Sequence, residues 1–206
     1  MGIDGLVWKL YHMSEAITKV MYINMLWIGF TLAGLGIFGL FPATAAMFAV
    51  TRKWMLGEKA IPVFRTFWDT YKADFFQINI LGYSFVLLGM ILYVDLRFFQ
   101  TSDLFILQAV SFLFFAFLLI YFLILLYFFP VFVHFQYKTF EYIKYTLILA
   151  IGRPVQSIMM IAGCILVLFI LRMFPALILF AGGGLMSVVL MWISIRCFPK
   201  ENVADS

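Results

Sequence analysis

Residues 104–133 read LFILQAVSFLFFAFLLIYFLILLYFFPVFV, a run without one charged side chain. A helix needs about 20 apolar residues to cross the roughly 30 Å hydrocarbon core of a bilayer. This run would extend about 45 Å at 1.5 Å per residue, so it either tilts or continues beyond the bilayer. We favour continuation with a kink at Pro130, because Tyr127, His134 and Tyr137 are residue types typical of the membrane interface. The run predicts a membrane protein.

Composition extends that conclusion to the whole chain. Of 206 residues, 66% are hydrophobic and 12% are charged, with a mean hydropathy of +1.08. Soluble domains have roughly 45–50% apolar and roughly 25% charged residues. We therefore expect an all-α integral membrane protein, and the length predicts a single transmembrane domain over residues 1–206.

Five segments are long and apolar enough to cross the bilayer. They are Val20–Phe41, Ile78–Val94, Leu104–Val133, Val155–Leu171 and Phe174–Ile195. Five crossings place the two termini on opposite sides, and basic residues concentrate on the cytoplasmic side. Ten basic residues, among them Arg52 and Lys53, fall on one predicted side, and four fall on the other: Lys9, Lys19, Arg97 and Arg172. The sequence thus predicts an N-terminus outside and a C-terminus inside. This bias also accounts for the net charge of +4 without a nucleic-acid partner.

The end of the first predicted span poses a choice between one long helix and two. Residues 39–48 read GLFPATAAMF, and proline is favoured at the first position of a helix, where its missing N–H costs nothing. We therefore predict a structural break at Pro42, with Ala43 and Thr44 in the first turn of a new helix at the cytoplasmic interface.

An aromatic stripe follows in the predicted cytoplasmic connection PVFRTFWDTYKADFF, residues 62–76. Helical spacing places five aromatic side chains on one face: Phe64, Phe67, Trp68, Tyr71 and Phe75. An amphipathic helix of this kind either lies in the membrane surface or docks its aromatic face in a groove on a partner protein. We treat the five aromatic residues as candidate partner-binding residues.

The second predicted cytoplasmic connection, residues 135–154, also has helical spacing. Gly152 and Pro154 form a typical stop signal at its end. We expect a second amphipathic helix on the cytoplasmic side.

The chain offers no pattern typical of a catalytic, cofactor or metal site. None of the predicted spans carries an ionisable residue near its centre, where such residues usually mark ion or proton pathways. His12 and His134 fall on opposite sides of the predicted topology, so they cannot share a metal ion. Glu15 follows His12 by three residues, but one acidic neighbour does not make a metal site. The usual hydrolase, phosphate-loop and zinc-protease motifs are absent from the sequence. We therefore expect a protein that is not an enzyme and has no cofactor.

Polar residues and glycines within the spans allow two interpretations. Asn24, Asn79, Gln108 and the run Gly182–Gly184 either hold helices together or line a path for a solute. We favour helix packing, since small residues allow close approach and amides bond across helices.

A few short motifs carry a family resemblance. They are Asn24–Trp27, the segment Gly39–Ala46, Arg52–Trp54 followed by Gly57–Glu58, and the later pair Arg153–Pro154. Together with the aromatic stripe they resemble the YesL-like family of bacterial membrane proteins of unknown function, over most of the chain. Members of that family are frequently encoded beside carbohydrate ABC importers. The resemblance implies a plasma membrane and a sugar-uptake context, and it supplies no catalytic residues.

Two functions follow from these observations. The first is a non-enzymatic accessory or regulatory protein of the plasma membrane, with the lipid bilayer and sugar ABC importer subunits as its partners. The alternative is a small permease for a neutral solute such as a saccharide. The sequence leaves self-association open.

Overall fold

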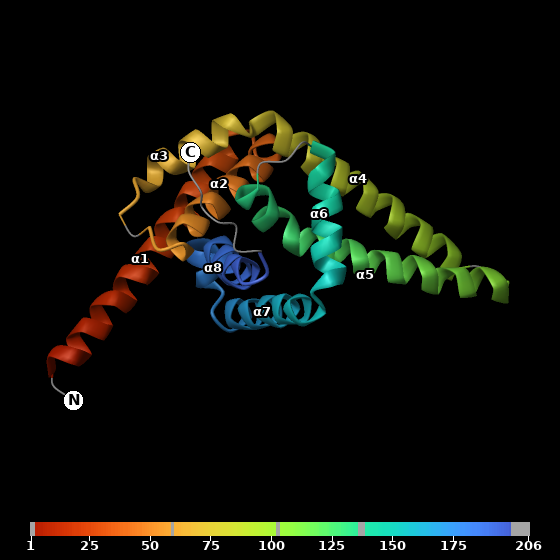
Figure 1. Ribbon diagram of the computed structural model, residues 1–206. Helices are drawn as coiled ribbons and strands as arrows, with labels where there is room; N and C mark the ends of the chain where they lie inside the picture. The colour runs from red at the N-terminus through yellow and green to blue at the C-terminus, as the bar shows by residue number, and fades with distance from the viewer. Residues whose placement is uncertain (1–2, 59, 102–103, 136–138, 199–206) are drawn as a thin grey trace.

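The computed structural model describes residues 3–58, 60–101, 104–135 and 139–198, which form eight helices (Figure 1). In chain order they are α1 (Ile3–Ala33), α2 (Ile37–Met55), α3 (Val63–Ala73), α4 (Phe75–Gln100), α5 (Phe105–His134), α6 (Thr139–Gly152), α7 (Pro154–Met173) and α8 (Ala176–Ile195). Five of these are long and apolar enough to cross a membrane: α1 from Val7 onward, α4, α5, α7 and α8. The predicted all-α bundle with five candidate spans is therefore confirmed.

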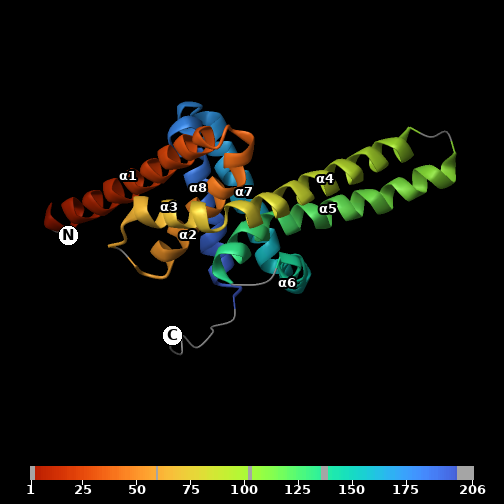
Figure 2. The same ribbon diagram turned by 90° about the horizontal axis from the view of Figure 1, so that it is seen from above.

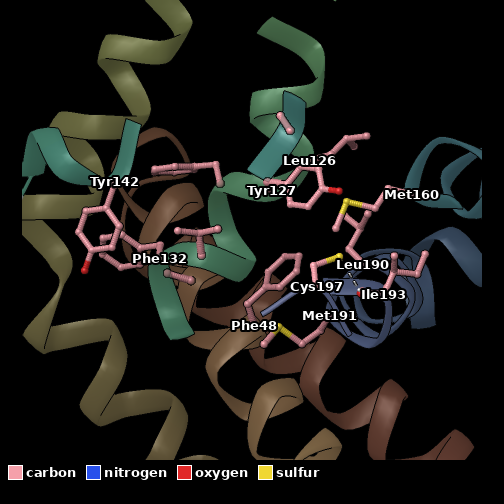
Figure 3. Packing of buried hydrophobic residues seen from close by; sticks show 14 of the residues in the cluster. Phe48, Leu126, Tyr127, Phe132, Tyr142, Met160, Leu190, Met191, Ile193 and Cys197 are labelled. Atoms are coloured by element: carbon pink, nitrogen blue, oxygen red, sulfur yellow. Dashed lines mark hydrogen bonds between the residues drawn. The ribbon is translucent and has the colours of Figure 1, made fainter. Parts of the chain in front are cut away.

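Helix α2 lies at the centre of the bundle, where it packs against α1, α3, α4, α5 and α8. Figures 1 and 2 show the N-terminal half of α1 projecting to one side, and the paired α4 and α5 projecting to the other. Figure 3 shows the largest buried cluster, in which Tyr127 of α5 lies beside Met160 of α7 and Leu190 of α8. Phe48 carries α2 into the same cluster.

The break predicted at Pro42 is wrong. The first helix ends at Ala33, and the chain turns through Leu35 and Gly36, whose φ angles are 59° and 75°. A Cβ on Gly34 would lie 2.4 Å from Cα of Gly39, and a Cβ on Gly39 would lie 2.5 Å from the carbonyl oxygen of Thr31. The turn falls here because only glycine permits so close an approach of two helix backbones.

Pro42, with Ala43 and Thr44, lies inside α2 instead. A proline within a helix leaves the carbonyl four residues earlier without its usual N–H donor, and here that residue is Phe38. The amide nitrogen of Asn79 on α4 donates to the Phe38 carbonyl oxygen over 3.0 Å. A neighbouring helix thus supplies the missing donor, which removes the reason to end the helix at Pro42.

The bounds of α5, α7 and α8 agree with the predicted spans to within two residues, whereas α4 extends six residues beyond the predicted end at Val94. Helix α5 runs without interruption through Pro130 to His134, and α6 ends at Gly152 with Pro154 opening α7. The predicted second amphipathic segment is therefore confirmed as a helix.

The N-terminal half of α1 lies at the same end of the bundle as the end of α2. The ammonium of Lys19 lies 6.0 Å from the centre of the Trp54 ring, and His12 lines a shallow cavity together with Trp54 and Met55. The expectation that Lys19 and Arg52 face opposite sides is therefore wrong, because α2 returns the chain to the level of Lys19. His12 and His134 consequently share one end of the bundle.

Candidate functional site

The aromatic stripe is divided between two helices. Helix α3 begins after Pro62 and ends at Ala73, because the backbone of Asp74 leaves the helical conformation at φ −101° and ψ 4°. Phe75 is then the first residue of α4. Four of the five predicted partner-binding residues therefore lie on one helix, and the fifth lies just beyond its end.

Half of the stripe on α3 packs inside the protein. Phe67 has no exposed surface and Tyr71 is 7% exposed, and the rings of both lie 5.1 Å from that of Phe30 on α1. The Tyr71 hydroxyl also donates to the Phe30 carbonyl oxygen over 3.3 Å. These two residues anchor α3 on the bundle, so their surfaces are already occupied by α1.

The other half of the stripe stays accessible. Phe64 is 54% exposed and Trp68 is 39% exposed. The centroids of their rings lie 6.1 and 5.4 Å from that of the Phe30 ring. The ammonium of Lys72 lies 4.7 Å above the Trp68 ring, a cation–π contact. We call Phe64 and Trp68 the aromatic edge. Partner binding stays a prediction. Of the aromatic stripe on α3, the side chains that a partner could reach are those of the aromatic edge.

Polar side chains in the bundle bond across helices. The Asn24 amide nitrogen on α1 donates to the Leu179 carbonyl over 2.7 Å, and its amide oxygen accepts from the Gly184 N–H over 3.1 Å. Thr51 and Ser187 share a hydrogen bond of 3.1 Å between α2 and α8. These groups therefore hold helices together, as expected of polar residues in lipid.

The glycine run of α8 lies against α1. A Cβ on Gly184 would lie 2.8 Å from the Val20 carbonyl oxygen, and one on Gly183 would lie 3.2 Å from the Asn24 amide oxygen. Close helix contact accounts for these two glycines.

A polar cavity of about 490 Å³ lies between α2, α3, α5 and α6. We call it the charged pocket, because its lining includes the charged and hydroxyl side chains Arg52, Lys53, Arg65, Thr66, Asp69, Thr70 and Asp74. Sequence reasoning missed it, and used Arg52 and Lys53 as basic residues that mark the predicted cytoplasmic side. The only available signal was the polar face of the amphipathic helix, since the pocket joins residues far apart in the chain. Arg52, for example, donates its Nε–H to Nδ1 of His134 over 3.0 Å across 82 positions.

Metal-binding groups do not converge in the part of the chain that the structure describes, where no cluster of three or more His, Cys, Asp or Glu side chains occurs. Cys164 and Cys197 are free and buried.

Comparisons with known proteins place the chain among relatives without an assigned function. Residues 20–96 match the family described as "Protein of unknown function, DUF624", a segment that runs from α1 through most of α4. The chain is 40% identical to the uncharacterized protein YesV of Bacillus subtilis (strain 168), over 94% of this chain and 93% of YesV. No solved structure matches the chain.

Two further relatives from the same organism extend the similarity. The chain is 38% identical to the uncharacterized protein YteU over 89% of this chain and 82% of YteU. It is 38% identical to the uncharacterized protein YesL over 94% of this chain and 91% of YesL. The chain therefore belongs to the YesL-like family of membrane proteins of unknown function.

Proposed function

We propose that this protein is a non-enzymatic accessory or regulatory protein of the bacterial plasma membrane that contacts subunits of a carbohydrate ABC importer. The carbohydrate context comes from the family resemblance noted in the sequence. The contact surface on this chain is the aromatic edge, Phe64 and Trp68.

The observation that carries the proposal is the division of the stripe on α3. Phe67 and Tyr71 are buried against Phe30, and this anchoring fixes the exposed Phe64 and Trp68 in place. Aromatic side chains held rigidly at a surface are typical of contact hot spots, because little conformational entropy is lost on binding.

The hydrogen bonds of the polar groups in the bundle favour the accessory role over the permease. A passage for a neutral solute needs hydrogen-bonding groups that face open space. Asn24, Thr51 and Ser187 instead bond to neighbouring helices, and Gly184 packs on the α1 backbone. These contacts support a closed, structural bundle.

Site-specific photocrosslinking in native membranes tests the proposal. A photoreactive phenylalanine analogue at position 68 should capture an ABC importer subunit in cells grown on the sugar that the importer carries. The same analogue at Phe112 of α5, a span residue that is 74% exposed, serves as the matched control and should capture lipid. Equal capture at the two positions, or no importer subunit at position 68, would refute the proposal.

The permease alternative has its own test. Purified protein in liposomes that contain no ATPase should not speed saccharide entry over empty liposomes if the protein is an accessory subunit. Saturable uptake in those liposomes would establish the permease instead.

A further inference from the structure

The charged pocket has two chemically different walls. Helix α2 contributes Arg52 and Lys53, whereas α3 and its junction with α4 contribute Thr66, Thr70 and Asp74. The remaining charged pair, Arg65 and Asp69, is mutually engaged at 3.7 Å. Positive groups therefore face hydrogen-bond acceptors across the cavity.

The positive wall lacks a close counter-charge. Among the residues that the structure describes, no carboxylate lies within ion-pair distance of Arg52 or Lys53, and Glu58 acts on Arg52 only at longer range. The hydrogen bond from Arg52 goes to Nδ1 of His134, and an imidazole nitrogen that accepts a hydrogen bond carries no proton and no negative charge. A guanidinium has five N–H donors, of which this contact uses one. Since a half-buried cation is costly without a partner, this wall is suited to bind an anion.

The opposite wall offers acceptors for hydroxyl groups. The Thr70 hydroxyl donates to the Thr66 carbonyl oxygen over 3.0 Å, which leaves its oxygen lone pairs to accept. Asp74 is half-buried, and no hydrogen bond or ion pair of its carboxylate occurs within residues 3–58, 60–101, 104–135 and 139–198. Burial raises the pKa of the Asp74 carboxyl. A hydrogen-bond donor on a ligand would therefore stabilise its ionised form.

We infer that the charged pocket binds a phosphate ester of a polyol. The phosphate would lie against Arg52 and Lys53, where a guanidinium and an ammonium can pair with the two negative charges of a monoester or the single charge of a diester. The polyol hydroxyls would donate to Asp74 and Thr70. A cavity of about 490 Å³ falls within the range of roughly 300–1,000 Å³ typical of small-molecule sites. This inference does not depend on the accessory role proposed above.

The same chemistry has two sources, a soluble sugar phosphate and the glycerophosphate headgroup of an anionic lipid. The pocket belongs to the end of the bundle that carries Arg52, Lys53 and Arg65, next to α3 and α6, so either source is accessible. The experiment therefore needs one arm for each.

In the first arm, glucose 6-phosphate and glucose are titrated into the purified full-length protein by isothermal calorimetry. We expect saturable binding of glucose 6-phosphate and none of glucose. In the second arm, nanodiscs of phosphatidylglycerol or phosphatidylcholine are compared by native mass spectrometry for retained lipid. Retention of phosphatidylglycerol alone would identify the lipid as the ligand source.

Variants connect binding to the pocket. Lys53→Gln should weaken binding of whichever ligand binds in the two arms, glucose 6-phosphate or phosphatidylglycerol, by about tenfold, because one charge-assisted contact is lost. Lys72→Gln, the same change on α3 at a residue outside the pocket lining, should bind as the parent protein does. Asp74→Asn should narrow the preference for glucose 6-phosphate over inorganic phosphate, since only the ester has hydroxyl donors. The melting temperature of each variant confirms that it is folded.

Two outcomes would overturn the inference. One is the absence of binding in both arms. The other is equal affinity in Lys53→Gln and the parent protein, which would place any bound phosphate elsewhere on the molecule.

Discussion

The side-chain amide of Asn79 on α4 donates to the carbonyl oxygen of Phe38 on α2, the group that Pro42 leaves without a helical donor. Asn79→Ala should therefore destabilise the protein by about 1–2 kcal/mol, the cost of an unpaired buried carbonyl. In a Pro42→Ala background, a restored backbone N–H serves Phe38, and the same Asn79→Ala change should cost clearly less. Melting curves of the four proteins of this double-mutant cycle measure the coupling. Equal costs in both backgrounds would contradict the compensation.

The two halves of the aromatic stripe should respond differently to truncation. Phe67→Ala removes a fully buried ring from the contact with Phe30, and core Phe→Ala changes cost about 3–5 kcal/mol. Phe64→Ala removes a ring that is 54% exposed and should change the melting temperature little. Partner capture therefore has to be tested at Phe64 and Trp68, since loss of partner binding in Phe67→Ala would only report loss of folding. A Phe67→Ala protein as stable as the parent would show that α3 does not pack on α1 as described.

Glycine at the α1–α2 turn should be irreplaceable. A Cβ on Gly39 would meet the Thr31 carbonyl oxygen at 2.5 Å, so Gly39→Ala should push the two helices apart and lower the melting temperature. Gly29→Ala is the control within the same helix pair, because a Cβ there meets nothing within 4 Å and alanine is the better helix former. The control should be neutral or stabilising. Equal losses in both variants would mean that the close approach at Gly39 is not present.

The start of α1 and the end of α8 should lie on the same side of the membrane. Helix α2 returns from the turn at Gly36 to the level of Lys19, since Trp54 lies beside that lysine. In each of the packed pairs α4–α5 and α7–α8, one helix crosses the bilayer and the next crosses back. Lys9 and Lys19 then join Arg52 and Lys53, which strengthens the basic bias of that side, and we predict that this side faces the cytoplasm.

In this topology α2 makes a sixth crossing in addition to the five candidate spans. Cysteine accessibility distinguishes it from the five-crossing topology. In a background without Cys164 and Cys197, a cysteine introduced at Met13 and one introduced at Arg196, just after α8, should both resist a membrane-impermeant maleimide in intact cells. Both should react after permeabilisation, with a cysteine at Leu35 as the outward-facing control. Labelling of position 13 in intact cells would support an N-terminus outside instead.

The Asp74 carboxyl should make stability depend on pH. Burial raises the pKa of this carboxyl above its usual value, so ionisation is disfavoured in the folded protein. The contribution of the protonated Asp74 carboxyl to the free energy of unfolding is present below the pKa of an exposed aspartate, about 3.9. It is lost as the pH rises through the higher pKa that this carboxyl has in the folded protein. Asp74→Asn should accordingly raise the melting temperature at pH 7 and have progressively less effect toward pH 4.

Asp69→Asn provides the comparison for that titration. Asp69 is exposed and pairs with Arg65 at 3.7 Å, so its substitution should give no gain at pH 7. A larger gain from Asp69→Asn than from Asp74→Asn would contradict the assignment.

The sequence predicted those features that depend on local pattern. Apolar runs of sufficient length located four of the five candidate spans, whereas the predicted span Val20–Phe41 runs across the turn between α1 and α2. The glycine and proline near residue 153 located the boundary between α6 and α7. The aromatic spacing of residues 64–71 correctly indicated an amphipathic helix. These signals are sufficient because each element is specified by its own residues.

The features that the sequence missed depend on neighbours distant in the chain. Pro42 ends no helix because Asn79 satisfies the carbonyl of Phe38, and the sequence around Pro42 contains no trace of that donor. Phe67 and Tyr71 looked available for a partner because nothing local marks Phe30 as their contact. The charged pocket likewise needs Arg52 and His134 to meet across 82 positions.

The amide of Asn24 joins α1 to α8, the first and last helices of the part of the chain that the structure describes, through Leu179 and Gly184. During synthesis α1 leaves the ribosome long before α8. The Asn24 amide therefore lacks its two hydrogen-bond partners on α8, in the membrane or beside the insertion machinery, until α8 has been inserted. Closure of the bundle is therefore among the last steps of biogenesis. Chains that stop before α8 would retain an unsatisfied amide in lipid, which is costly.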